Sequence, residues 1–181
     1  MPVIRPAQTD DASAIARVHV DTWRTTYTGI IPDEHLSNLS YDRAQANWFG
    51  YLSNPESETH AFVAEDETGQ LVGFASGGPL RERLGNYDGE LYVLYVLRPF
   101  QGMGYGKLLV SRVAHDLTSR GYHSLVIWVL KENPACRFYE RLGGWQIAEK
   151  AIEIGGKELI DVAYVWPDLA VFKEEGHQAE K

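Results

Sequence analysis

The stretch between residues 95 and 107 constrains the fold of this chain more than any other. An apolar run ends at Pro99, and glycines then stand at every second position, at Gly102, Gly104 and Gly106, before a helical pattern begins. Glycine costs backbone entropy wherever it stands, so this spacing indicates that something approaches the main chain closely. A glycine loop that opens a helix directs unpaired N–H groups and the positive helix end toward one point. The expected occupant is an anion, most often a phosphate.

Lys107, in the first turn of that helix, adds a positive charge beside the loop. A Walker A motif would need a glycine at Gln101 and a serine or threonine at Leu108, so that motif fails at both ends. A dinucleotide fingerprint needs GxGxxG and an acidic residue about 20 positions on, where this chain reads YHSLV. A turn that only packs the helix tightly on a sheet remains as the plain alternative.

Hydrophobic patterning predicts an α/β fold with a mixed, largely antiparallel sheet and helices on both faces. We expect one domain over residues 1–172 and a disordered tail over 173–181. One parallel pair is expected, because the strand at 86–99 leads through the helix at 104–120 to an apolar strand at 124–130. The other expected strands are 3–7, 60–66, 70–78 and two around the turn at Gly155–Gly156, and the other helices follow residues 9–11, Ser40 and Asn133.

Composition excludes several classes of function. The formal net charge is −8 and the pI is near 5.2, which argues against nucleic acid as a partner and is compatible with a cationic small molecule. Cys136 is the only cysteine, so no intrachain disulfide can form and a reducing compartment is expected. The sequence begins without an apolar stretch of signal-peptide length, and its longest apolar run is far short of a membrane span. We therefore expect a cytoplasmic protein without a membrane partner, and no metal, because the six histidines lack ligand spacing.

Read together with Gln101, the glycine loop is Q-x-x-G-x-G after the strand LYVLYVLRP, and the segment ENPACRFYERLGG follows it. These two motifs resemble the signatures of the GNAT acetyltransferase superfamily, whose loop binds the pyrophosphate of acetyl-coenzyme A (acetyl-CoA). The order of elements across residues 3–166 is also similar to that family. The segment WRTTYTGIIPDEHLSNL resembles a bacterial branch that acts on small amines.

The resemblance implies where acetyl-CoA would bind. The family's parallel strands splay apart and hold the pantetheine arm between them, which assigns main-chain contacts to Leu94, Tyr95 and Val96. An N–H near Val96 would hold the thioester carbonyl. Asn133 would hydrogen-bond along the pantetheine, or act only as a helix N-cap. The pyrophosphate loop would comprise Gln101, Gly102, Met103, Gly104, Tyr105, Gly106 and Lys107.

The implied reaction is direct attack of a neutral amine on the thioester, without an acyl-enzyme. Glu90 is the expected general base, acting through water, and its alternative is a solvated glutamate at the strand end. Tyr139 is the expected acid for the departing thiolate, and its alternative is a core tyrosine. Trp23 and Tyr27, four residues apart on one helix, would wall the acceptor pocket or belong to the core.

The expected function is therefore acetyl-CoA-dependent N-acetylation of a primary amine on a small molecule such as a polyamine, amino acid, amino sugar or antibiotic. A protein N-terminus is an alternative acceptor. A noncatalytic acyl-CoA-binding sensor and a nucleotide-binding protein are alternatives from other classes. Retention of both Glu90 and Tyr139 favours an enzyme. The family often forms dimers, so a homodimer is one oligomeric state that the resemblance implies.

Overall fold

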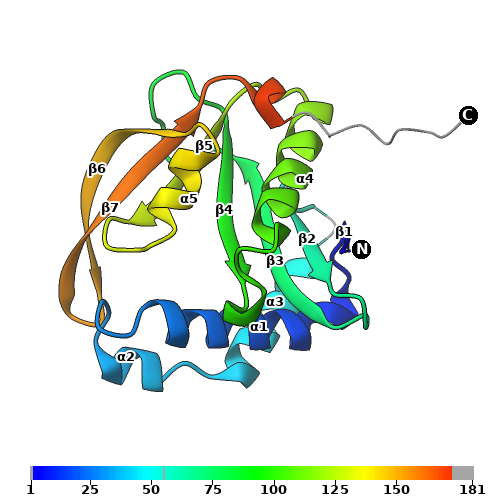
Figure 1. Cartoon of the computed structure of the whole chain (residues 1–181), viewed down its shortest axis with the longest axis vertical. Helices are drawn as coiled ribbons and strands as arrows, with labels where there is room; N and C mark the ends of the chain where they lie inside the picture. Colours follow the sequence, from blue (N-terminus) through cyan, green and yellow to red (C-terminus); the bar gives the residue numbers. More distant parts are fainter. Residues whose placement is uncertain (1, 55, 173–181) are drawn as a thin grey trace, which may run out of the picture.

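A seven-stranded sheet organises the computed structural model, which describes residues 2–54 and 56–172 (Figure 1). The strand order is β1-β2-β3-β4-β5-β7-β6, and every neighbouring pair is antiparallel except β4–β5. The strands are β1 (Val3–Pro6), β2 (His60–Glu65), β3 (Leu71–Pro79), β4 (Gly89–Val96), β5 (Leu125–Leu130), β6 (Trp145–Ile154) and β7 (Lys157–Trp166). This confirms the mixed, largely antiparallel sheet with one parallel pair.

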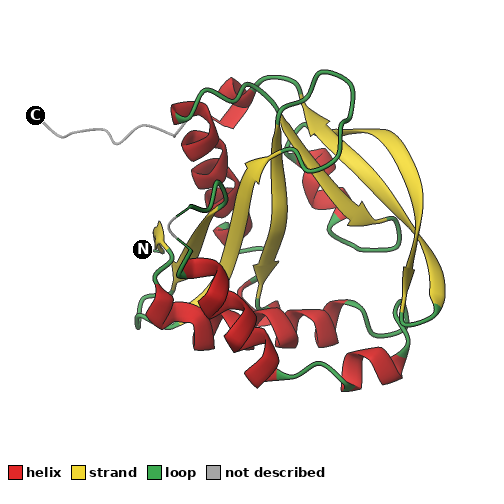
Figure 2. Cartoon of the chain, turned by 180° about the vertical axis from the view of Figure 1, so that it is seen from behind, coloured by secondary structure: helices red, strands yellow, loops and turns green. Residues whose placement is uncertain are grey.

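Helices cover both faces of the sheet (Figure 2). The helices α1 and α3 pack together on one face, and α4 packs on the other against β2, β3 and β4. The helices are α1 (Ala12–Thr26), α2 (Asp33–Ser37), α3 (Tyr41–Leu52), α4 (Tyr105–Ser119) and α5 (Cys136–Arg141), with 3-10 turns η1 (Thr9–Asp11), η2 (Arg98–Phe100) and η3 (Leu169–Phe172). The sequence did not predict α2, which is little more than one turn.

Local sequence explains where two of these helices begin. The Ser40 side chain accepts a hydrogen bond from the backbone N–H of Arg43 at 3.2 Å, as expected of an N-cap for α3. The helix α4 begins after Gly104 and buries Leu109, but not Leu108, which is 41% exposed. The two leucines face different surroundings because consecutive helical residues point about 100° apart.

The strand β4 is shorter than its apolar pattern predicts. It begins at Gly89 and ends at Val96, and Pro99 lies in η2 rather than at the strand end. Pairing with β3 continues one residue further in part, because Leu97 N–H donates to the Val72 carbonyl at 2.9 Å. The strand β5 is buried on both faces, as its apolar run predicted.

The parallel pair β4–β5 is joined over a very short length. Only Gly89↔Leu125 and Glu90↔Val126 are in register, and beyond them the two strands separate (Figure 1). The joined end is tight, since a Cβ on Gly89 would lie 2.6 Å from the Ser124 carbonyl oxygen. We call this short joined length the β4–β5 seam.

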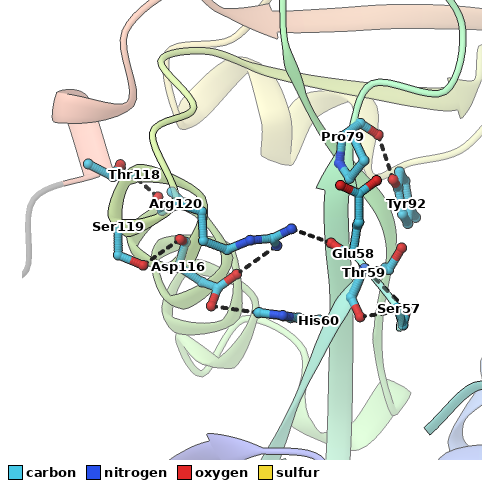
Figure 3. Close-up of polar contacts among 11 residues, drawn as sticks. Ser57, Glu58, Thr59, His60, Pro79, Tyr92, Asp116, Thr118, Ser119 and Arg120 are labelled. Atoms are coloured by element: carbon cyan, nitrogen blue, oxygen red, sulfur yellow. Dashed lines mark hydrogen bonds and ion pairs between the residues drawn. The ribbon is translucent and has the colours of Figure 1, made fainter. Parts of the chain in front are cut away.

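A β-bulge lies in β4 directly after the seam. Ser76 of β3 faces Val93 and the next residue, Gly77, faces Leu91, so Tyr92 is an extra residue in β4. A bulge bends its strand and increases the local twist, and this one lies where β4 and β5 begin to separate. The Tyr92 hydroxyl is held by donating to the Pro79 carbonyl at 2.5 Å (Figure 3).

The chain that enters β2 is tied to the end of α4 beside this bulge. The Arg120 guanidinium donates to the Glu58 carbonyl, and the His60 and Asp116 side chains approach within 2.9 Å (Figure 3). These contacts join the start of β2 to the C-terminal end of α4.

No helix among residues 2–54 and 56–172 has both the length and the apolar character needed to cross a bilayer. The tail expected at 173–181 lies outside the described residues.

Candidate active site

A cleft of about 890 Å³ opens where β4 and β5 separate. Its walls come from α1, β4, β5, the β6–β7 hairpin, the first turn of α4 and the helix α5. Of the predicted site residues, the structure brings Trp23, Tyr27, Leu94, Tyr95, Val96, Gln101, Gly102, Gly104, Gly106, Lys107, Asn133 and Tyr139 to this cleft. Glu90, Met103 and Tyr105 are not among the residues that line it.

The main chain of β4 presents hydrogen-bonding groups to the cleft. Leu97 N–H is directed at Val72 of β3, so by the alternation of strand geometry the N–H and C=O groups of Val96 and Leu94 face the opposite, open side. The Val96 carbonyl accepts a hydrogen bond from the Gln101 side chain at 2.9 Å. Gln101 therefore fastens the glycine loop to the end of β4.

The three glycines of the loop serve two different purposes. Gly102 and Gly104 have φ angles of +77° and +92°, which L-residues rarely adopt, and a Cβ on either would meet no atom within 4 Å. Open space therefore lies in front of both. A Cβ on Gly106 would instead lie 3.2 Å from the Phe138 ring, so Gly106 permits α4 to pack on α5. For Gly106, the observed contact agrees with the alternative in which the glycine only permits tight packing of the helix.

Unpaired amides stand at the first turn of α4. Leu108 N–H is the first to donate into the helix, to the Gly104 carbonyl at 3.1 Å, so the amides of Tyr105 and Gly106 have no intrahelical acceptor. The Tyr105 side chain is buried in the core, and Met103 is 63% exposed. Neither of these two predicted residues is among those that line the cleft.

Positive charge lines the cleft on the side of this loop. Arg98 from η2, Lys107 from α4 and Arg141 from α5 all line it, although the protein as a whole carries a net charge of −8. Sequence reasoning missed Arg98 and Arg141. Each had a signal, because Arg98 stands three residues before Gln101 and Arg141 follows the FYE segment of the second motif.

The tyrosine predicted as an acid lies buried at the cleft. Tyr139 is 3% exposed, and its hydroxyl has no hydrogen-bond partner among the described residues. Burial raises the pKa of Tyr139 above its ordinary value of 10, so the phenol keeps its proton at neutral pH. Tyr139 also packs in the core, so both interpretations of this residue describe its position.

Asn133 has both of its side-chain polar atoms engaged within the protein. Its Oδ1 accepts from Ala135 N–H at 2.9 Å, as in an N-cap, and its Nδ2 donates to the Tyr27 hydroxyl at 3.1 Å. Trp23 Nε1 in turn donates to the Tyr95 hydroxyl at 2.8 Å, and the Trp23 and Tyr27 rings meet edge to face at 5.0 Å. Trp23 and Tyr27 thus form part of the core and also a wall of the cleft.

Comparison with known proteins identifies the family. A family model described as FR47-like protein matches residues 71–152. The chain is 40% identical over 173 residues to YuaI of Bacillus subtilis, an uncharacterized N-acetyltransferase, covering 96% of this chain and 97% of the relative. The chain belongs to the GNAT superfamily of N-acetyltransferases.

Two further similarities of this GNAT chain are to other N-acetyltransferases. It is 30% identical over 111 residues to a [ribosomal protein bS18]-alanine N-acetyltransferase of Haemophilus influenzae, covering 61% of this chain and 73% of the relative. The crystal structure of PaiA N-acetyltransferase from Thermoplasma acidophilum, in complex with coenzyme A, superposes with a TM-score of 0.67 at 18% identity. That likeness, over 90% of this chain and 98% of the other, confirms the GNAT fold.

Glu90 of this GNAT protein lies away from the cleft. It is 1% exposed, so the interpretation as a solvated strand-end glutamate was wrong. Its carboxylate accepts from the Arg81 guanidinium at 2.5 Å and from Arg81 N–H at 2.9 Å. The Arg81 guanidinium lies 4.3 Å from the centre of the Tyr92 ring. This arrangement favours a structural role for Glu90, which holds the β3–β4 connection against the bulge.

One carboxylate that lines the cleft was not predicted from the sequence. Asp161 of β7 lines the cleft, and a signal for it exists in the strand KELIDVAYVW. Strand alternation places Asp161 on the same face as Leu159, Ala163 and Val165, which are all buried, so an acid stands among apolar residues on this face.

Proposed function

We propose that this N-acetyltransferase binds acetyl-CoA in the cleft beyond the β4–β5 seam and transfers the acetyl group directly to the primary amine of a small molecule. The observation that carries this proposal is the separation of two parallel strands after only two paired positions. It leaves strand N–H and C=O groups of Leu94 and Val96 facing a cleft instead of a neighbouring strand. An extended pantetheine arm offers the complementary amide groups.

The glycine loop suits the diphosphate of the same molecule. Open space in front of Gly102 and Gly104 lets phosphate oxygens approach the main chain, where the first-turn amides of α4 can donate to them. Arg98, Lys107 and Arg141 supply positive charge on this side. The side of the cleft that bears the loop therefore fits a polyanion in a protein that is acidic overall.

Bound acetyl-CoA supplies an activated acetyl thioester. The Val96 N–H faces the cleft and can donate to the carbonyl oxygen as negative charge develops on it. Tyr139, which is buried at the cleft, would give a proton to the departing sulfur. An alkylamine has a pKa of roughly 10 and must lose a proton before it attacks. Glu90 is the sequence prediction for that base, and its ion pair with Arg81 weighs against it.

Direct transfer, without an acyl-enzyme, is supported by the position of the single cysteine. Cys136 is not among the residues that line the cleft, and its sulfur lies 3.5 Å from the Leu130 carbonyl oxygen. Burial raises the pKa of the Cys136 thiol, so little thiolate is present at neutral pH. The thiol is therefore a poor nucleophile in this position.

Substitution of a loop glycine tests the proposal. Gly104→Ala adds a methyl group that only a ligand would meet, and it forces a positive φ on alanine. We expect the Kd for acetyl-CoA, measured by calorimetry, to rise by roughly tenfold or more, about 1.4 kcal/mol.

The matched control is Gly121→Ala, at the other end of α4. Gly121 has a φ of +89° and equally open space, so alanine there brings the same backbone strain far from the loop. Both variants should lose similar thermal stability, but Gly121→Ala should bind acetyl-CoA like the parent protein. Equal affinity in Gly104→Ala would contradict the loop assignment.

A further inference from the structure

Asp161 is the one carboxylate that lines the cleft in the described chain. It lies in β7 in register with Leu130 of β5 on one side and Lys150 of β6 on the other. Paired residues share a face of the sheet, so Asp161 points to the side on which Leu130 packs with Tyr27. It is half-buried.

The expected partner of Asp161 is engaged elsewhere. A lysine directly opposite an aspartate would ordinarily form a cross-strand ion pair. The Lys150 ammonium instead lies 2.6 Å from the Glu82 carboxylate and 4.2 Å from the centre of the Trp128 ring. Asp161 has no hydrogen bond or ion pair within the part of the chain that the structure describes. Leaving a half-buried carboxylate without a partner is unfavourable unless a ligand supplies one.

The surroundings of Asp161 suit an organic cation. Tyr27, Ile152 and Ile154 line the same part of the cleft and pack in one apolar cluster with Leu130. An ammonium group can pair with the carboxylate while the rest of the ligand lies against these side chains. Burial raises the pKa of Tyr27, and the charge of Asp161 raises it further, which agrees with their proximity.

Positive charge is segregated from this part of the cleft. The basic lining residues Arg98, Lys107 and Arg141 belong to η2, α4 and α5, on the side of the glycine loop. Among the described residues of α1, β6 and β7 that line the cleft, there is no basic side chain. Lys150 acts on Asp161 through its charge, but it does not line the cleft and is already paired with Glu82. An acceptor with its own carboxylate would therefore place that group near Asp161 without a free cation to neutralise it.

We propose that Asp161 binds the ammonium group of the acceptor, which releases one proton to water before the free amine attacks the thioester, and that it selects amines that carry no carboxylate and have an apolar alkyl or aryl body. This inference rests on the proposed function and narrows its acceptor class. Amino acids are disfavoured because their own carboxylate would be repelled by Asp161. Polyamines are disfavoured because the described lining has no second carboxylate for their second ammonium group.

Matched pairs of acceptors test the selection. Phenethylamine and isopentylamine differ from phenylalanine and leucine only by the α-carboxylate. With acetyl-CoA and a thiol-release assay, we expect kcat/KM for each amine to exceed that of its amino acid by at least about tenfold. Faster turnover of either amino acid, of spermidine, or of a peptide with a free N-terminal alanine would overturn the proposal.

Substitution of Asp161 tests its role. Asp161→Asn keeps the shape and removes the charge, and should raise KM for the preferred amine by roughly ten- to a hundredfold, as expected for a lost charge-assisted hydrogen bond. Asp161→Glu should recover part of that affinity. Glu158→Gln, an exposed position on the same strand, should change nothing. In Asp161→Asn the Kd for acetyl-CoA should be unchanged, and an unaltered KM for the amine would overturn the assignment.

A stability measurement tests Asp161 without any acceptor. Burial raises the pKa of Asp161, so its charge destabilises the folded state above that pKa, and the penalty disappears below about pH 4, where the unfolded chain is protonated as well. Lys150, Glu82 and Tyr27 are the other titratable groups that interact with it. Asp161→Asn should therefore raise Tm at pH 7, by on the order of 1–2 °C, and not below pH 4. A lower Tm at pH 7 would show that Asp161 has a stabilising partner.

The outcomes separate this inference from the proposed function. If acetyl-CoA binds but neither phenethylamine nor isopentylamine is acetylated, the acceptor class is wrong and the acetyl-CoA site remains. If acetyl-CoA does not bind, the proposed function itself is contradicted.

Discussion

Tyr139 suits the role of an acid because it is buried at the cleft. Burial raises its pKa, so the phenol is fully protonated at the pH where the enzyme works. A free thiol has a pKa of about 8.5, lower than that of a phenol, so transfer of the proton to a solvated thiolate would be uphill. The same burial disfavours a thiolate in the cleft and raises its proton affinity as well.

Removing the Tyr139 hydroxyl measures its contribution. Tyr139→Phe should lower kcat by about ten- to a hundredfold and leave KM for acetyl-CoA nearly unchanged, because the proton is needed only as the sulfur departs. Tyr164→Phe is the matched control, because its ring lies 6.1 Å from that of Tyr139 and its hydroxyl donates to Glu140 rather than lining the cleft. Equal kcat values for the two variants would remove the acid role.

Single residues could be assigned from the sequence only where their surroundings are local. The positive φ angles of Gly102 and Gly104 follow from a short loop between a strand and a helix, and the sequence predicted that loop. The contact of Gly106 with Phe138 joins two helices separated by a strand. Asp161 lacks an ion-pair partner because Lys150 pairs with Glu82 instead. A local sequence pattern does not show which of several distant residues a side chain will contact.

At the scale of elements, the β3–β4 connection and the bulge act as one unit. Arg81 pairs with the buried Glu90 at the seam and covers the ring of the bulged Tyr92. The sequence predicted the order of strands and helices, because apolar periodicity and turn residues mark each of them. It did not predict the bulge, since an extra residue in a strand is visible only against its neighbour.

Removing Arg81 tests this unit. Arg81→Ala leaves the Glu90 carboxylate buried without its ion-pair partner, so the free energy of unfolding should fall by about 2–3 kcal/mol in urea denaturation. The double variant Arg81→Ala/Glu90→Gln should recover part of the loss, since no charge is then buried. Glu82→Ala, which breaks an exposed ion pair nearby, should cost less than about 1 kcal/mol. An Arg81→Ala protein as stable as the parent would show that the pair contributes nothing.

At the scale of the whole molecule, the β4–β5 seam is the only place where the two parts of the described sheet are joined by strand pairing, and it spans two residue pairs. The strands β1 to β4 lie on one side of it and β5, β7 and β6 on the other. Acetyl-CoA bound between them would bridge these two parts, and RT ln(1 + [L]/Kd) gives about 2.7 kcal/mol of added stability at 100 times Kd.

Hydrogen exchange can follow this bridging amide by amide. In the free protein the N–H groups of Leu94 and Val96 face the cleft and should exchange quickly, while that of Tyr95, directed at β3, should exchange slowly. With acetyl-CoA, Leu94 and Val96 should become protected by at least about tenfold, and Tyr95 should change little. Protection of Tyr95 alone would mean that acetyl-CoA binds elsewhere.

The brevity of the seam sets a limit on how this protein can be made more robust. Pairing β4 with β5 beyond Glu90, as far as Val96, would satisfy the amides of Leu94 and Val96 and strengthen the sheet. The same amides are those that we propose bind the pantetheine arm of acetyl-CoA. Thermostability gained in this way would therefore come with the loss of acetyl-CoA binding and of activity.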